Sequence, residues 1–167
     1  MSKEKIVESR IYEAVATSAK AIVVRCPDRR FRIAHNLFIG EELGLTGNEF
    51  WPIKMAGGAG ALARPDEMPH DFACIVGQIA TFCSHDPVEH IVLFTHQHCR
   101  HYSAIRGKTG GNPERDDLEE AIRFLSEKYP YIETSAYFAA FTDDRQTHIF
   151  FETIKECSLR EGLLSKC

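Results

Sequence analysis

Two short and almost wholly apolar segments constrain the fold more than any other feature of the sequence. Residues 21–25 read Ala-Ile-Val-Val-Arg, and residues 90–95 read His-Ile-Val-Leu-Phe-Thr. Neither segment alternates between apolar and polar positions, as a strand with one wet face would. Such runs are typical of strands buried on both faces, which occur in parallel sheets covered by helices on each side. The sequence therefore predicts an α/β domain.

Helical patterns alternate with the predicted strands. Periodic apolar residues predict helices over residues 34–44 and 68–84. A third helix is expected after Asn112, a favourable N-cap, with Pro113 in its first position and acidic residues in its first turn. Further strands are predicted over residues 49–55, 132–141 and 147–154, and a loop over residues 56–60. Pro52 places the strand over 49–55 at a sheet edge, because proline cannot donate to a ladder. This alternation predicts a mainly parallel sheet.

The size and charge of the chain limit its organisation and its partners. We expect a single domain over residues 1–167, with an N-terminal helix within residues 1–19 and a C-terminal tail over residues 155–167. The net charge of −4 argues against nucleic acid as a main partner, because binding phosphates needs a basic surface. No apolar run approaches the roughly 20 residues of a membrane helix, and the charged N-terminus lacks the apolar stretch of a secretory signal. We therefore expect a cytoplasmic protein without a membrane partner.

Cysteine and histidine residues follow two of the predicted strands. Cys26 comes directly after the first strand, and His96 and Cys99 follow the third. If these two strands are neighbours, the three side chains converge at the carboxyl ends of the strands, where open α/β sheets bind their ligands. Two thiolates and one imidazole suit zinc, and three protein ligands leave a fourth position for water or substrate. The sequence thus predicts a zinc site of the catalytic type.

Chance spacing and simple burial could also account for these cysteines and histidines. About 0.3 His-x-x-Cys pairs are expected by chance in a chain with 8 His and 6 Cys. A buried cysteine is also often only a small apolar residue, and we assign Cys74 and Cys83, on the helix over 68–84, to the core. The metal hypothesis gains specificity because the ligand motifs follow successive buried strands.

A second motif surrounds the first cysteine. Residues 26–30 fit the pattern C-x-D-x-R, which places Asp28 and Arg30 in the same loop as a ligand. Asp28 would accept a hydrogen bond from water on the metal, or ligate the metal itself, and Arg30 would hold Asp28 through a charge-assisted pair. Taken alone, the two residues would more often form a solvated surface pair. His98 and His101 flank the ligands and are either proton shuttles or, more commonly, ordinary surface histidines.

The combination of C-x-D-x-R with a downstream H-x-x-C resembles the β-class carbonic anhydrases. Residues 42–58, with Leu-Thr-Gly at 45–47 and Ile-Lys-Met-Ala-Gly-Gly at 53–58, are similar to the second-strand segment of that family, which usually ends Arg-Asn-Ala-Gly. The strand–turn–strand over 132–154 is similar to the family's ending. The resemblance covers roughly residues 20–154.

The resemblance implies a sheet of order 2-1-3-4 with a fifth strand at its edge, flanked by helices, in a homodimer or a larger homo-oligomer. It implies a lyase activity, the reversible hydration of CO2 to bicarbonate by hydroxide on one zinc ion per chain. The implied site comprises the zinc ligands Cys26, His96 and Cys99, the catalytic pair Asp28 and Arg30, and the substrate-pocket residues Ala56, Gly57 and Gly58.

Four residues depart from the family pattern. The family usually has glycine before the histidine ligand and after the second cysteine, where this chain has Thr95 and Arg100. Lys54 and Met55 replace the usual Arg-Asn. These departures leave the ligands intact but bear on the shape of the pocket. Two alternatives therefore stand beside CO2 hydration: a related zinc hydrolase of carbon disulfide or carbonyl sulfide, and a non-catalytic zinc-binding oligomeric domain.

Overall fold

A computed structural model describes residues 18–106 and 112–157 of the chain. The helix predicted within residues 1–19 lies almost wholly outside the described residues. Residues 158–167 of the predicted C-terminal tail lie outside them as well.

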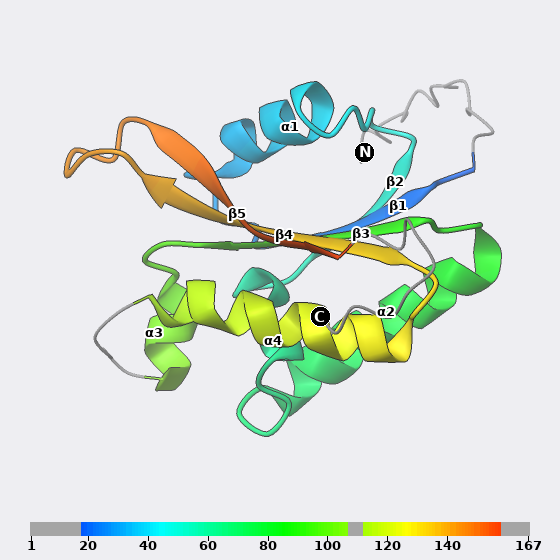
Figure 1. Ribbon diagram of the computed structural model, residues 1–167. Helices are drawn as coiled ribbons and strands as arrows, with labels where there is room; N and C mark the ends of the chain where they lie inside the picture. The colour runs from blue at the N-terminus through cyan, green and yellow to red at the C-terminus, as the bar shows by residue number, and fades with distance from the viewer. Residues whose placement is uncertain (1–17, 107–111, 158–167) are drawn as a thin grey trace, which may run out of the picture.

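Within the described residues, five strands form one sheet of order β2-β1-β3-β4-β5 (Figure 1). The strands are β1 (Ala21–Arg25), β2 (Phe50–Lys54), β3 (His90–His96), β4 (Glu133–Phe141) and β5 (Ile149–Cys157). Neighbouring strands among β1 to β4 pair in parallel, and β5 pairs antiparallel to β4. The predicted α/β class and strand order are confirmed. Pro52 lies on β2, which is an edge strand as predicted.

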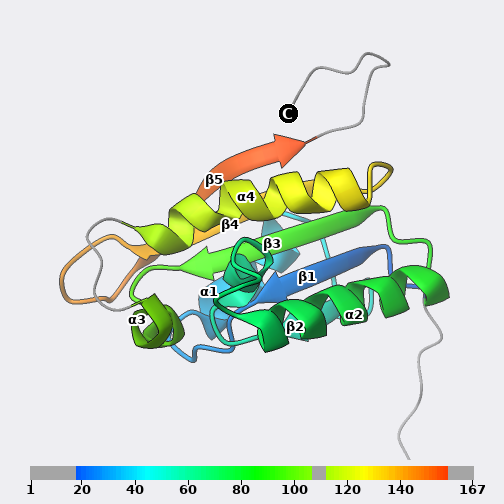
Figure 2. The same cartoon turned by 90° about the horizontal axis from the view of Figure 1, so that it is seen from below.

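Helices cover both faces of the sheet (Figures 1 and 2). They are α1 (Arg32–Glu41), the 3-10 helix η1 (Gly58–Leu62), α2 (Pro69–His85), α3 (Arg100–Arg106) and α4 (Pro113–Lys128). In Figure 1, α1 lies above the sheet and α2, α3 and α4 lie below it. The loop predicted over 56–60 overlaps the helical turn η1. Helix α3 was not predicted, because seven residues are too few to show an apolar period.

The central strands are mainly apolar because each of their faces is covered. In β1, Ile22 and Val24 belong to the core on the side of α2 and α4, whereas Val23 belongs to the core under α1. All three side chains have no exposed surface. Burying an aliphatic side chain of this size contributes roughly 1.5–3 kcal/mol, so both layers of helices are held to the sheet by the same short strands.

Several local details differ from the predictions, including helix α1, predicted over residues 34–44 and found at Arg32–Glu41. Cys74, assigned to the core, is exposed, because Ile75 and Ile79 occupy the inward face of α2; Cys83 is half-buried and packs against the core. Asn112 occupies the N-cap position of α4, but its side chain makes no capping hydrogen bond. The final strand, β5, extends to Cys157. Among the described residues no helix is long and apolar enough to cross a membrane.

The strand order reverses direction between β1 and β3. After β1 the chain moves outward to β2 on one side, and later returns to form β3 on the other side of β1. Such a reversal of strand order leaves a crevice at the carboxyl ends of the strands, because the connecting segments diverge there. Cys26 follows β1 and His96 ends β3 at this edge.

Candidate metal centre

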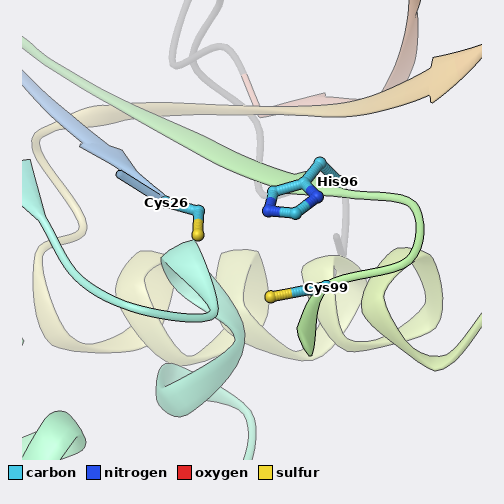
Figure 3. Close-up of side chains that lie close together, drawn as sticks. All are labelled: Cys26, His96 and Cys99. Atoms are coloured by element: carbon cyan, nitrogen blue, oxygen red, sulfur yellow. The ribbon is translucent and has the colours of Figure 1, made fainter. Parts of the chain in front are cut away.

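Three buried side chains converge at the carboxyl edge of the sheet (Figure 3). Cys26 follows β1, His96 is the last residue of β3, and Cys99 lies directly before α3. One ligand atom from each residue lies within 4.8 Å of the others. His96 was expected just past the end of its strand. It instead pairs with Ala139 of β4, so the pleat of the sheet fixes the direction of its side chain.

The tautomer of His96 suits a metal ligand. Its Nδ1 lies 3.0 Å from the carbonyl oxygen of Gln97, and because a carbonyl only accepts, Nδ1 donates the proton. Nε2 then keeps a lone pair. This atom is buried and has no hydrogen-bond partner in the part of the chain that the structure describes. Phe31 stacks on the ring with centroids 4.3 Å apart and holds it in place.

Backbone amides surround the two sulfur atoms. The amides of Asp28 and Gly57 hydrogen-bond to the Cys26 sulfur, and the amide of Tyr102 to the Cys99 sulfur. A hydrogen bond between the two thiols lowers the pKa of Cys99 and raises that of Cys26, while burial raises both. Amide donors favour the charged form of sulfur, so the pair is prepared to carry the thiolates that a metal requires.

Asp28 and Arg30 form a two-pronged ion pair beside these three candidate ligands. Arg30 donates from Nη2 to Asp28 Oδ2 at 2.8 Å and from Nε to both carboxylate oxygens at 3.2 Å. These bonds, with that of the Arg30 amide to Oδ1, lower the pKa of Asp28 to about 2. Arg30 Nη2 also donates to the carbonyl oxygen of His98 at 3.0 Å. Asp28 Oδ2 lies 3.9 Å from His96 Nε2, so the pair lies at the rim of the ligand cluster.

Solved structures of carbonic anhydrases share this architecture. The β-carbonic anhydrase isoform I of Trichomonas vaginalis matches with a TM-score of 0.56 at 17% identity, covering 87% of this chain and 88% of that chain. The carbonic anhydrase of Streptococcus mutans matches with a TM-score of 0.54 at 12% identity, covering 88% of both chains. A tetrameric β-carbonic anhydrase of Sordaria macrospora matches with a TM-score of 0.54 at 11% identity, covering 86% of this chain and 84% of that chain.

The chain has the fold of the β-carbonic anhydrases. At these identities the similarity establishes the arrangement of elements. No protein-family model matches the sequence, and no curated protein matches it.

Within this β-carbonic anhydrase fold, the predicted pocket residues lie beside Cys26. The amide of Gly57 reaches the Cys26 sulfur, and Ala56 before it is half-buried. Gly58 has a φ of +62°, and a Cβ there would lie 2.2 Å from the carbonyl oxygen of Phe94. Only glycine fits at this position, because both the backbone conformation and the space exclude a side chain. At Gly57 and Gly58 the chain therefore passes close to Cys26 without a side chain.

The residues that depart from the family pattern occupy different environments. Thr95 is buried, and its Oγ1 donates to the carbonyl oxygen of Glu114 at 2.6 Å, so its side chain points into the protein. Arg100 is exposed at the start of α3. Lys54 is exposed at the end of β2, and the Met55 amide donates to Arg25 of β1 at 3.0 Å. None of these contacts involves a ligand atom of the cluster.

The two candidate proton shuttles also differ. His98 is exposed, and its φ of 56° places a non-glycine residue in the left-handed region. His101 is half-buried, and its Nε2 lies 2.9 Å from Oδ2 of Asp71 on α2. Its ring lies 3.0 Å from where a Cβ on Gly57 would be. Asp71 had no signal in the sequence, because nothing local connects two residues on different helices.

An ion pair with a buried carboxylate connects to Tyr102, the residue whose amide donates to the Cys99 sulfur. Asp117 of α4 has no exposed surface and accepts hydrogen bonds from Arg64 at 2.6 Å and from the Tyr102 hydroxyl at 3.0 Å. Burial, followed by the charge of Asp117, raises the pKa of Tyr102, so its hydroxyl keeps its proton and remains a donor. Tyr102 is thus held at two points, because its amide donates to the Cys99 sulfur and its hydroxyl donates to Asp117. Nothing in the sequence pattern indicates this network, because its members lie far apart along the chain.

Proposed function

We propose that the chain is a zinc-dependent carbonic anhydrase that interconverts CO2 and bicarbonate. One observation carries the proposal: Cys26, His96 and Cys99 converge beside the Asp28–Arg30 pair at the switch point of a β-carbonic anhydrase fold. Each part could be structural in isolation, but together a ligand set with an open position and an oriented carboxylate beside it suit metal-assisted hydration.

The residues present fit zinc. The donors are two sulfur atoms and one imidazole nitrogen, the borderline-soft set that zinc prefers. Leaving a buried nitrogen without a partner is costly, and Nε2 of His96 is such an atom among the described residues. A zinc ion held by Cys26, His96 and Cys99, one per chain, would satisfy this nitrogen and both sulfur atoms together.

The chain's own residues prepare the neighbouring carboxylate. When bound, zinc would lower the pKa of a water molecule at its open position and so supply a nucleophile near neutral pH. Arg30 engages both oxygens of Asp28, which keeps Asp28 charged and fixes its direction. Asp28 would then accept a hydrogen bond from the O–H of the reacting water and so orient its lone pair. Because Arg30 already occupies these oxygens, Asp28 is better placed as an acceptor than as a fourth ligand.

Protons must leave the site in each cycle. His101 has the better-defined setting of the two candidate shuttles, because Asp71 orients its ring and Gly57 separates it from the Cys26 sulfur. His98 is exposed to solvent, and its carbonyl oxygen accepts the hydrogen bond from Arg30. We propose that His101 carries protons outward, with His98 as a second route.

The decisive experiment is stopped-flow CO2 hydration on zinc-loaded protein. The wild type should bind one zinc per chain and hydrate CO2 well above the metal-free background. Asp28→Ala should retain zinc and lose about 100-fold or more in rate, because it removes the acceptor without touching a proposed ligand. Cys99→Ala should lose zinc and activity together.

Cys74→Ala is the matched control, because Cys74 is exposed on α2 and outside the ligand cluster. A wild-type rate equal to the metal-free background would refute the proposal. Turnover of carbon disulfide or carbonyl sulfide in its place would assign the same site to a hydrolase, and a zinc-bound but inert protein would assign it to a structural domain.

We further propose a single domain over residues 1–167 that forms a homodimer or a larger homo-oligomer in the cytoplasm. Ile33 and Leu37 of α1 support an interface, since they lie one helical turn apart and are 68% and 52% exposed. The tetrameric state of the Sordaria macrospora enzymes is consistent with it. Light scattering that finds only monomers at micromolar concentration would contradict this assembly.

A further inference from the structure

One residue of α4 contacts both ends of the ligand-bearing turn between β3 and α3. The carbonyl oxygen of Glu114 accepts a hydrogen bond from Thr95 Oγ1 at 2.6 Å. Its side-chain Oε1 accepts one from the Cys99 amide at 3.2 Å. Thr95 directly precedes the ligand His96, and Cys99 is itself a ligand. Glu114 therefore brackets the segment that supplies two of the three metal ligands.

The two hydrogen bonds of Glu114 are buried, and the helix that carries this residue is well packed. Glu114 is 6% exposed, Thr95 is 1% exposed and Cys99 is 2% exposed. Helix α4, which carries Glu114, packs against β3, β4 and η1. Hydrogen bonds in such a place are shielded from water, and removing one partner leaves a buried amide or hydroxyl unsatisfied. A first-turn acid would serve the helix dipole from an exposed position, so its burial points to another role.

The turn that Glu114 brackets contains a residue in an uncommon backbone conformation. His98 has a φ of 56°, in the left-handed region that few non-glycine residues adopt. Two bonds hold the middle of the turn, from the Gln97 amide to Ala139 and from Arg30 to the His98 carbonyl. Without its end contacts, the turn could relax and move the Cys99 sulfur away from His96.

We propose that Glu114 is a positioning residue that sets the spacing of the His96 and Cys99 ligands before the metal binds. The inference rests on the proposed function only in taking these residues as metal ligands. Thr95, which stands where the related enzymes usually have glycine, supplies the second contact of the bracket. Partners behind metal ligands typically change metal affinity by about 10–100-fold when removed.

The test measures zinc affinity of the full-length metal-free protein by competition with a chromophoric chelator. Glu114→Ala should weaken zinc binding by about 10–100-fold, whereas Glu114→Gln should bind zinc within about threefold of wild type, because the amide oxygen can still accept from Cys99. Thr95→Val should weaken binding and Thr95→Ser should restore it. Asp116→Ala is the control, since Asp116 shares the first turn of α4 but is 72% exposed.

Two further readouts separate positioning from folding. Cobalt-substituted Glu114→Ala should show an altered thiolate-to-metal charge-transfer band, while the band of Glu114→Gln should match wild type. Urea unfolding of each metal-free variant identifies any that does not fold, and the comparison then rests on Thr95→Val against Thr95→Ser. Wild-type zinc affinity in Glu114→Ala, or equal losses in Glu114→Ala and Glu114→Gln, would overturn the proposal. Because no arm measures CO2 hydration, an inactive wild type would not affect this result.

Discussion

Phe31 packs against two buried histidines whose surroundings differ. Its ring stacks on His96 with centroids 4.3 Å apart, and its centroid lies 6.1 Å from that of His35. Both imidazoles are 1% exposed. Each also has a ring nitrogen without a hydrogen-bond partner within the described ranges: Nε2 in His96, and both nitrogens in His35. Burial and lack of a partner are thus common to the two sites.

The neighbours of the two rings separate them. His96 faces two cysteine sulfur atoms and has Asp28 at its edge. His35, on α1, faces the rings of Phe94 and Phe151, at centroid distances of 4.9 and 5.5 Å. An unpartnered buried nitrogen therefore indicates a ligand site only where other donors converge. Where aromatic carbon surrounds it, the same feature costs stability.

The largest expected effect comes from replacing each of the two histidines in turn. His96→Ala should lower zinc affinity at least a thousandfold, about 4 kcal/mol, because it removes one of the three proposed ligands. His35→Phe should leave zinc stoichiometry unchanged. Metal analysis after dialysis and thermal unfolding with and without zinc would measure both, since a bound metal raises the unfolding temperature by mass action.

Either of two results would contradict this comparison of the two histidines. Loss of zinc from His35→Phe would mean that the metal site depends on how His35 packs against Phe94 and Phe151. Zinc retained by His96→Ala would mean that the two cysteines recruit a different third ligand.

Gly58 lies between Cys26 of the candidate metal site and Phe94, which packs against His35. Replacing Gly58 should give the next largest effect. A Cβ at this position would lie 2.2 Å from the carbonyl oxygen of Phe94 and 3.3 Å from the Cys26 amide nitrogen. Both neighbours are backbone, so neither can move without shifting a strand. We expect Gly58→Ala to lower the free energy of unfolding of the metal-free protein by about 2–4 kcal/mol.

Gly40 provides the control for Gly58, because it is exposed on α1 and a Cβ added there would meet no atom within 4 Å. Gly40→Ala should stabilise the protein by about 0.5–1 kcal/mol, through the better helix propensity of alanine. Urea unfolding of both variants would test the pair. Equal effects would show that the close approach of the Gly58 backbone to β3 carries no energetic weight.

Local patterns were sufficient to predict the strands of the sheet, and the family resemblance supplied their order; Cys26, His96 and Cys99 converge as expected, and their role as metal ligands stays a prediction. Contacts across the chain account for what was missed. The strand over 90–95 was predicted one residue short, because apolar character ends at Thr95 whereas backbone pairing continues to His96. Cys26 and His96 could be placed together because parallel strands end at a common edge.

Glu114 shows why the rest could not be predicted. In the sequence it is an acidic residue in the first turn of a helix, and the helix dipole explains it completely. Only the packing of α4 against β3 brings it to the Cys99 amide. The pairing of His101 with Asp71 was hidden for the same reason, since the two residues belong to different helices.

The smallest expected effect is a difference in acid sensitivity at His35. Burial lowers the pKa of His35 to about 3 from a reference value of 6.5. The positive charge of Arg25 lowers this pKa further, and the negative charge of Asp28 raises it. Below pH 6.5 the unfolded chain therefore binds a proton that the folded chain refuses. Because the unfolded state binds more protons, stability falls as the pH is lowered from 6.5 toward 3.

Each proton so bound costs at most about 1.4 kcal/mol per pH unit. Urea unfolding of the metal-free wild type and of His35→Phe at pH 7, 6 and 5 would isolate this contribution, since acidic residues contribute equally to both. The wild type should lose more stability than His35→Phe between pH 6 and 5, by about 1 kcal/mol. Parallel profiles, or an NMR titration of the His35 ring near pH 6.5, would show that water reaches this nitrogen. The contrast with His96 would then rest on ligand chemistry alone, because burial would no longer be common to the two rings.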